Sequence, residues 1–194
     1  MPALSPRPDV MEFLLTRRSR PAKTLTAPGP DNDTLLPILQ AALRVPDHGK
    51  LEPWRLIVLD RAALTRLAEV TETLGTAQGR DADKLAKSVA MFRDAPTMVA
   101  VIATPVASDK IPAVEQTLSA GAVCLGLLNA ALASGWGANW LTGWMATDPD
   151  WLRQALTLDK GDSVAGFMVL GTEGAVPPDR PRPDMAAKIT WLSA

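Results

Sequence analysis

The clearest pattern in the chain is an uncharged stretch, residues 116–147, which contains no Asp, Glu, Lys or Arg. Its first half is long and apolar enough to raise the possibility of a membrane span, for which about 18 consecutive apolar residues suffice. Gln116, Asn129 and Ser134 interrupt the apolar run, and no basic cluster flanks it to set an orientation. We therefore predict the central helix of a soluble core and no membrane partner.

Small side chains follow one row of this helix at a spacing of four residues, namely Ala122, Gly126, Ala130 and Ser134. Such a row lets another backbone come close. Because the helix is apolar nearly all round, it has no side that favours water. Other elements of the chain, or a second subunit, must cover it.

Apolar residues at helical spacing predict two helices near the N-terminus. Asp9 is the expected N-cap of the first, whose apolar positions are Met11, Phe13, Leu14 and Leu15. Asp33 is the expected N-cap of the second, whose apolar face should hold Leu35, Leu36, Leu39 and Leu43.

Further helices are expected on both sides of the uncharged stretch. Residues 64–74 have a helical pattern, and Asp148 or Asp150 should cap a short helix that runs through Leu156. The segment 77–93 is polar and charged, and we expect a mobile helical excursion over the surface, anchored by Leu85, Val89, Met91 and Phe92.

Four apolar or β-branched runs predict strands, at residues 54–59, 97–103, 139–142 and 163–170, the last ended by Gly171. The proline-rich tail 177–183 should be extended, because its prolines disfavour both helix and ladder. By pattern alone, strands that alternate with helices favour a parallel α/β sheet.

Composition narrows the class of protein. The 194 residues fit one domain, residues 1–194, and a net charge of -1 gives no electrostatic reason to expect nucleic acid. The N-terminus lacks the order of a secretion signal, and a single Cys124 cannot form an internal disulfide, so we expect a cytoplasmic location.

The same counts exclude several chemistries. One histidine and one cysteine cannot build the usual zinc sites, so no metal is expected. A serine hydrolase would need His48 as its base, and the Gly-x-Ser-x-Gly motif does not occur in the sequence. If the protein is an enzyme, a cofactor should therefore carry the reaction.

Positive charge gathers in three places, which are Arg17-Arg18-Ser19, Arg44 with His48, and Arg180 with Arg182. Arginine suits phosphate and carboxylate oxygens. The alternative is that arginines near helix C-termini complement the helix dipole. His48 is likewise open to two interpretations, a hydrogen-bonding side chain or an acid–base catalyst.

Four segments in order along the chain, residues 17–19, 46–54 (PDHGKLEPW), 134–137 (SGWG) and 166–171 (GFMVLG), together resemble the FMN-dependent nitroreductase family and its minimal short-chain branch. The resemblance implies an α+β sandwich, with a mainly antiparallel sheet packed among helices, in an intertwined homodimer with two FMN sites at the interface. It further implies that NAD(P)H reduces FMN and that a small acceptor, such as a nitro compound or a quinone, takes the reducing equivalents in a ping-pong cycle.

The resemblance also implies residue roles. It assigns Arg17, Arg18 and Ser19 to the FMN phosphate, ribityl chain and pyrimidine edge, with Arg182 and secondarily Arg180 on the phosphate. It assigns Arg44 and His48 to FMN contacts from the partner subunit. The flavin ring would lie against the backbone of Trp140, Leu141, Thr142 and Gly143, and NAD(P)H near Ala130, Ala131, Leu132, Ala133, Ser134 and Gly135.

No side chain is assigned as a catalyst by the resemblance, because the flavin carries the chemistry. Lys50 and Glu52 stand where the wider family commonly has Asn and Gln, so the polar contacts of that loop differ here. The alternative function is a non-catalytic flavin- or phosphate-binding protein on the same fold.

Overall fold

The computed structural model describes residues 3–193. Its strands are β1 (Leu25–Thr26), β2 (Trp54–Leu59), β3 (Thr97–Ala103), β4 (Gly137–Leu141) and β5 (Ser163–Glu173). They form one sheet in the order β1-β5-β3-β2, and β4 also pairs with β5. Every pairing between these strands is antiparallel, so the parallel sheet predicted from pattern alone is wrong and the α+β fold is confirmed.

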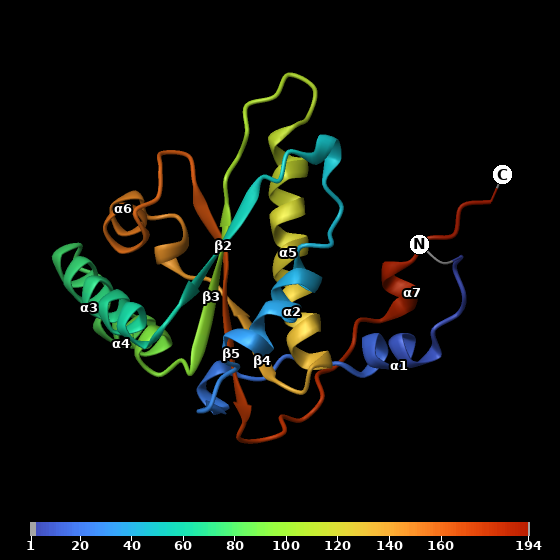
Figure 1. The fold of residues 1–194 in the computed structure, drawn as a ribbon, viewed down its shortest axis with the longest axis horizontal. Helices are drawn as coiled ribbons and strands as arrows, with labels where there is room; N and C mark the ends of the chain where they lie inside the picture. The colour runs from blue at the N-terminus through green and yellow to red at the C-terminus, as the bar shows by residue number, and fades with distance from the viewer. Residues whose placement is uncertain (1–2, 194) are drawn as a thin grey trace.

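The α-helices are α1 (Pro8–Thr16), α2 (Asn32–Ala42), α3 (Arg61–Ala77), α4 (Ala82–Arg93), α5 (Ala113–Ala133), α6 (Pro149–Leu156) and α7 (Met185–Lys188). Short 3-10 turns occur at η1 (Ala22–Thr24), η2 (His48–Lys50) and η3 (Trp144–Ala146). Figure 1 shows α3, α4 and α6 on one side of the sheet and α5 with α2 on the other. The two helix layers enclose two separate hydrophobic cores.

Helix α4 is part of the core, which corrects the expectation of a mobile excursion at residues 77–93. Leu85, Val89 and Phe92 occur at spacings of four and three residues, and all three are buried. Phe92 stacks on Trp151, with 5.5 Å between ring centroids, and meets Phe167 edge-on. The charged residues that suggested an excursion occupy the opposite, solvated face of this amphipathic helix.

Several boundaries also differ from the predictions. Helix α2 is capped by Asp31, whose side chain accepts a hydrogen bond from the Thr34 N–H, and it buries Leu35, Ile38 and Ala42. Helix α1 is flanked by Arg7 without a side-chain cap, and none of its residues is buried. Strand β5 continues past Gly171 to Glu173, because Thr172 and Glu173 pair with Thr26 and Leu25 of β1. Asp148 is the cap of α6, as one of the two alternatives predicted.

Helix α5 is long and apolar enough to cross a membrane by length and composition, yet its inner face packs on the sheet. Val123, Cys124 and Leu127 are fully buried there. Its outer face is exposed at Val114 (62%), Leu118 (67%) and Leu125 (46%). We call these three residues the outer face of α5.

The row of small residues on α5 does allow a close approach, and the neighbour is in the same chain. A Cβ at Gly126 would lie 3.0 Å from the carbonyl oxygen of Ala42 in α2. The outer face of α5 remains uncovered by the described residues of the chain.

Both ends of the described chain extend away from the sheet on the α5 side, as Figure 1 shows for α1 and α7. They carry exposed apolar side chains, at Val10, Met11, Leu14 and Leu15 in α1 and at Met185, Ile189, Trp191 and Leu192 near the C-terminus. Such a quantity of exposed apolar surface is typical of an interaction surface.

Candidate functional site

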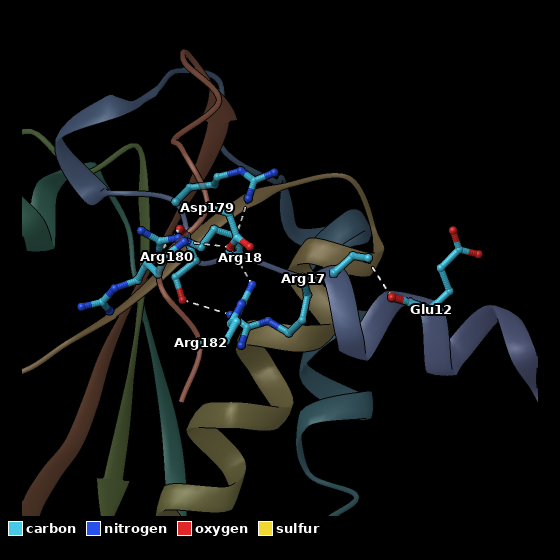
Figure 2. Close-up of polar contacts among 9 residues, drawn as sticks. Glu12, Arg17, Arg18, Asp179, Arg180 and Arg182 are labelled. Carbon is cyan, nitrogen blue, oxygen red and sulfur yellow. Dashed lines mark hydrogen bonds and ion pairs between the residues drawn. The ribbon is translucent and has the colours of Figure 1, made fainter. Parts of the chain in front are cut away.

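Five arginines from two distant segments meet near the C-terminal end of α5. Arg17, Arg18 and Arg20 follow α1, and Arg180 and Arg182 belong to the tail; we call them the arginine cluster. Figure 2 shows four of these side chains together, with Asp179 among them. Arg17 Nη2 donates to Ser19 Oγ (3.0 Å), and Arg182 Nη2 donates to Asp179 Oδ1 (2.7 Å).

The cluster has more positive charge than its carboxylates neutralise. Glu173 pairs with Arg20 and Asp179 pairs with Arg182, whereas Arg17 and Arg18 form no ion pair within residues 3–193. Burial lowers the pKa of Arg17, and so do the charges of Arg182, Arg18 and Arg20. The protein therefore holds several like charges close together, which favours binding of an anion.

Two buried nitrogen atoms point to the same conclusion. The Nε atoms of Arg17 and Arg18 are buried without a hydrogen-bond partner among the described residues. Buried donors are almost always paired, and an unpaired one calls for an explanation such as a bound group. Phosphate oxygens would pair with donors of this kind.

Strand β4 is joined directly to the cluster. The Arg20 N–H donates to the Ala138 carbonyl (2.9 Å), and Asn139 Nδ2 donates to the Arg20 carbonyl (2.5 Å). At Gly137 a Cβ would lie 2.4 Å from the Leu25 side chain, so this close approach requires glycine. The cluster is thereby fixed at the beginning of β4.

A cavity lies beside β4, between this strand and α4. It has a volume of about 260 Å³ and is lined by Leu141 together with Ala22, Lys23, Lys87, Ala90, Met91, Asp94, Ala95 and Val169. A strand rises about 3.3 Å per residue, so Ala138 and Leu141 are about 10 Å apart. An apolar cavity with lysines in its lining thus extends along β4, from Ala22 and Lys23, which follow Arg20 in the chain, to Leu141.

The segment 140–143 presents mainly backbone at this end of β4. Trp140 Nε1 donates to the Ala165 carbonyl (3.1 Å), and a Cβ at Gly166 would collide with the indole, so the ring is held over β5. Thr142 and Gly143 follow the strand and are exposed. Their backbone is therefore accessible beside the cavity.

A second group of predicted residues lies on the loop 46–54. Asp47 carboxylate oxygens accept from the N–H groups of Leu51 (3.2 Å) and Glu52 (2.9 Å). Gly49, Lys50 and Glu52 all have positive φ angles, of 72°, 53° and 47°. Asn enters this left-handed region more readily than Lys, so Lys50 in place of Asn places strain in the loop.

The loop is attached to the N-terminal half of α5. Ser119 Oγ donates to the Pro46 carbonyl (2.8 Å) and lies 3.0 Å from the Nε1 donor of Trp54. His48 Nδ1 lies 2.7 Å from Oε2 of Glu115 in the first turn of α5. His48, Glu115 and Ser119 line a further cavity of about 310 Å³.

One chain does not bring the two groups of residues together. The arginine cluster is joined to β4 directly after α5, whereas His48 contacts the first turn of α5. At 1.5 Å per residue, the helix separates Glu115 from Ala133 by about 27 Å. Arg44 is exposed and follows α2, four residues before His48 in the sequence.

The segment 130–135 shows a gradient of exposure. Ala131 is fully buried, Ala130 and Leu132 are half-buried, and Ala133, Ser134 and Gly135 are exposed. Among residues 3–193 no cluster of His, Cys, Asp and Glu could hold a metal ion.

Sequence reasoning missed Arg20, Lys23, Lys87 and Glu115. Arg20 directly follows the predicted motif, so its basic side chain was a usable signal. Lys87 and Glu115 come near the site only through tertiary packing, since Glu115 is 67 residues from His48. No local pattern marks them.

Comparison with known proteins gives consistent results. The model of the Nitroreductase family matches residues 14–172. The protein of Escherichia coli strain K12 that carries the name "Putative NAD(P)H nitroreductase YdjA" is 35% identical over 165 residues, which cover 84% of this chain and 88% of that protein.

Solved structures share the fold. The nitroreductase-like family protein from Bacillus cereus has a TM-score of 0.78 at 19% identity, covering 99% of this chain and 100% of that chain. A nitroreductase with bound FMN from Bacteroides fragilis has a TM-score of 0.74 at 22% identity, covering 95% of this chain and 99% of that chain.

Proposed function

Because this chain belongs to the nitroreductase family, we propose that it is an FMN-dependent oxidoreductase that uses NAD(P)H to reduce a small acceptor such as a nitro compound or a quinone. When bound, FMN would supply the redox chemistry of a ping-pong cycle, and the chain would bind and orient it. The observation that carries the proposal is the arginine cluster, with two buried Nε donors that have no partner among residues 3–193.

In this proposal the arginine cluster holds the FMN phosphate. Arg17, Arg18 and Arg182 supply guanidinium donors, and Ser19 lies within reach of Arg17. Arg180 is a secondary contact from the same tail. Because Arg182 is paired with Asp179, it would have to exchange that carboxylate for a phosphate oxygen.

The ring of the flavin is proposed to lie against the end of β4. The backbone of Trp140, Leu141, Thr142 and Gly143 forms one wall, and the cavity beside Leu141 supplies apolar surface. Lys23 and Lys87 would place positive charge near the ring, which favours an anionic reduced state.

The complete site is proposed to need a second copy of the chain. In an isologous dimer each contact occurs twice, so two α5 outer faces can pack antiparallel on each other. The N-terminal end of each α5 would then lie near the C-terminal end of the other. This arrangement brings Arg44 and His48 of one copy toward the arginine cluster and β4 of its partner.

The donor NAD(P)H is assigned to the end of α5, as the resemblance implies. Of residues 130–135, Ala133, Ser134 and Gly135 are exposed, so direct contact should fall on these three. We place the protein in the cytoplasm, where NAD(P)H is available and a reduced Cys124 is expected.

Two measurements test the proposal. Arg17→Ala should weaken FMN binding by more than about tenfold, because a charge-assisted hydrogen bond contributes about 1.5–3 kcal/mol. Arg153→Ala is the matched control, since Arg153 is exposed on α6 and pairs with Asp150. Equal affinities in the two variants would remove Arg17 from the site.

Anaerobic addition of NADH and of NADPH tests the activity itself. Bleaching of bound flavin by either donor supports the oxidoreductase. Bound flavin that stays oxidised with both donors would instead favour a non-catalytic flavin-binding protein on this fold.

A further inference from the structure

His48 is the only histidine in the chain, and the structure fixes its position. Its Nδ1 lies 2.7 Å from Oε2 of Glu115, while Nε2 makes no hydrogen bond to the described residues. The loop around it is constrained by the hydrogen bonds of Asp47 and by Gly49, where an added Cβ would lie 2.5 Å from Ile111. The imidazole therefore has one nitrogen engaged and the other available to a ligand.

The available nitrogen belongs to a residue that lines a cavity. His48 and Glu115 border the cavity of about 310 Å³, together with Pro46, Leu118, Ser119 and Ala122. Leu118 is also part of the outer face of α5. A second copy that covers this face would close the cavity toward its own β4, where the flavin ring is proposed to lie.

The proposed reaction needs a proton at this place. NAD(P)H, a quinone and H⁺ give NAD(P)⁺ and a hydroquinone. A C–H bond of the dihydronicotinamide breaks, its electron pair reduces the quinone, and two O–H bonds form. The hydride accounts for one of the two protons, so one proton must come from another donor. The reduction of a nitro group to a nitroso group and water requires the same hydride and the same additional proton.

We propose that His48 is the catalytic acid that gives this proton to the acceptor, and that Glu115 is the positioning residue that holds it. With Nδ1–H donated to Glu115, the Nε2–H bond is left to donate to an oxygen of the acceptor. After the transfer the imidazole is neutral and Nδ1–H stays bound to Glu115. The inference rests on the proposed function, because the acceptor must bind beside His48.

Water would restore the proton between turnovers, and in one chain, before a second copy covers the cavity, 62% of the His48 side chain is exposed. Several charged groups occupy the elements around His48, namely Asp47 and Lys50 on its loop, Glu115 on α5, and Asp109 and Lys110 beside Ile111. The Asp47 carboxylate is engaged by backbone N–H groups, so Glu115 is the carboxylate that contacts the imidazole.

The test separates the two half-reactions of the FMN-loaded full-length protein by anaerobic stopped-flow absorbance. His48→Gln should slow reoxidation by 1,4-benzoquinone by about 10²- to 10⁴-fold, the range for loss of a general acid. The rate of bleaching by NADPH should fall much less than the rate of reoxidation, since that step needs no acid from His48.

Two further readouts distinguish an acid from a structural side chain. Wild-type reoxidation should slow as pH rises and should show a solvent isotope effect, whereas His48→Gln should show neither. Added imidazole should restore part of the rate. In a proton NMR spectrum, hydroquinone should shift the ring signals of the single histidine of the wild type.

Glu115→Gln should slow reoxidation by about tenfold and alter its pH profile, and Glu69→Gln on the exposed face of α3 is the matched control. Equal reoxidation of His48→Gln and wild type overturns the inference. So does an equal slowing of both half-reactions together with weaker FMN binding, which would indicate a contact that only holds the cofactor. Wild-type flavin that NADPH and NADH both fail to bleach overturns the proposed function itself, which is a different result.

Discussion

The two layers of helices beside the sheet differ in how completely they are covered. On the side of α3, α4 and α6, the rings of Phe92, Trp151 and Phe167 are fully buried, with centroids 5.2–5.8 Å apart. Trp151 Nε1 donates to Thr71 Oγ1 (2.8 Å), so even the polar atom of this cluster is paired. On the other side, the inner face of α5 is equally buried, but Leu118 on its outer face is 67% exposed.

The two layers therefore have different roles: the aromatic cluster stabilises the fold, and the outer face of α5 is proposed to complete the site. The aromatic cluster supplies a core that needs nothing from outside the chain. The outer face of α5 leaves apolar surface that favours a second copy. The arginine cluster and His48 lie near opposite ends of α5, so the same surface that is incomplete for packing also joins the two parts of the proposed site.

The largest expected effect is a loss of stability on the side of α3, α4 and α6, which is covered within one chain. Trp151→Ala should lower the free energy of unfolding by about 3–5 kcal/mol, because it leaves a cavity and removes the partner of Thr71. Urea unfolding followed by circular dichroism measures this loss. Trp191→Ala is the control, since Trp191 is 88% exposed, and its effect should stay within about 0.5 kcal/mol. Similar losses in both variants would contradict a self-contained aromatic core.

Sequence patterns predicted the sheet and the layer of α3, α4 and α6 only in part. The strands at 54–59 and 97–103 were recognisable because apolar residues, β-branched ones among them, dominate both short runs. Helix α4 was misjudged because its surface charges outnumber the three residues, Leu85, Val89 and Phe92, that anchor it. Antiparallel pairing came from the family resemblance, because strand direction is set by tertiary connections that local pattern does not encode.

The residues of the candidate site could likewise be predicted only in part. Arg17, Arg18 and Arg182 could be predicted because the arginines stand in short motifs, and the structure places them together. The pairing of His48 with Glu115 could not, because it depends on how loop 46–54 folds against α5. The short helix α7 was also missed, since it spans only Met185–Lys188 after a proline-rich segment.

A substitution on the outer face of α5 should weaken the proposed dimer before it destabilises the fold. Leu118→Glu should raise the dissociation constant of the proposed dimer by at least about 100-fold, or about 2.7 kcal/mol, because symmetry places carboxylates in an apolar contact twice. Sedimentation equilibrium measures the constant, and circular dichroism should show an intact fold. Val58→Glu, at an exposed position on the edge strand β2, should leave the constant unchanged. A dimer that tolerates Leu118→Glu would place the interface elsewhere.

The burial of Cys124 on the inner face of α5 can be tested through the pH dependence of the free energy of unfolding. Burial raises the pKa of the Cys124 thiol to about 12, whereas an unperturbed thiol has a pKa of about 8.5. The unfolded chain therefore loses this proton first, and the contribution of Cys124 to stability is present below about pH 8.5 and is lost as pH rises toward 12. Between these values the free energy of unfolding should fall by about 1.4 kcal/mol per pH unit on account of this group.

The free energy of unfolding of Cys124→Ala should lack the part of the pH dependence that comes from the thiol. The difference in this free energy between wild type and variant should therefore narrow by about 1.4 kcal/mol per pH unit. Urea unfolding at pH 8, 9 and 10 measures it. Parallel curves for the two proteins would show that water reaches the thiol in the folded state.

The smallest effect compares two glycines on opposite sides of α5. A Cβ at Gly126 would lie 3.0 Å from the Ala42 carbonyl oxygen, whereas a Cβ at Gly121 would meet only the Trp140 ring, at 3.9 Å. Alanine is more favourable than glycine inside a helix by about 1 kcal/mol. Gly121→Ala should therefore stabilise the chain by about that amount, while Gly126→Ala should lose the gain because the α2 backbone has to move. Thermal unfolding of the two variants measures the difference. Equal stabilisation would show that α2 does not pack tightly on α5.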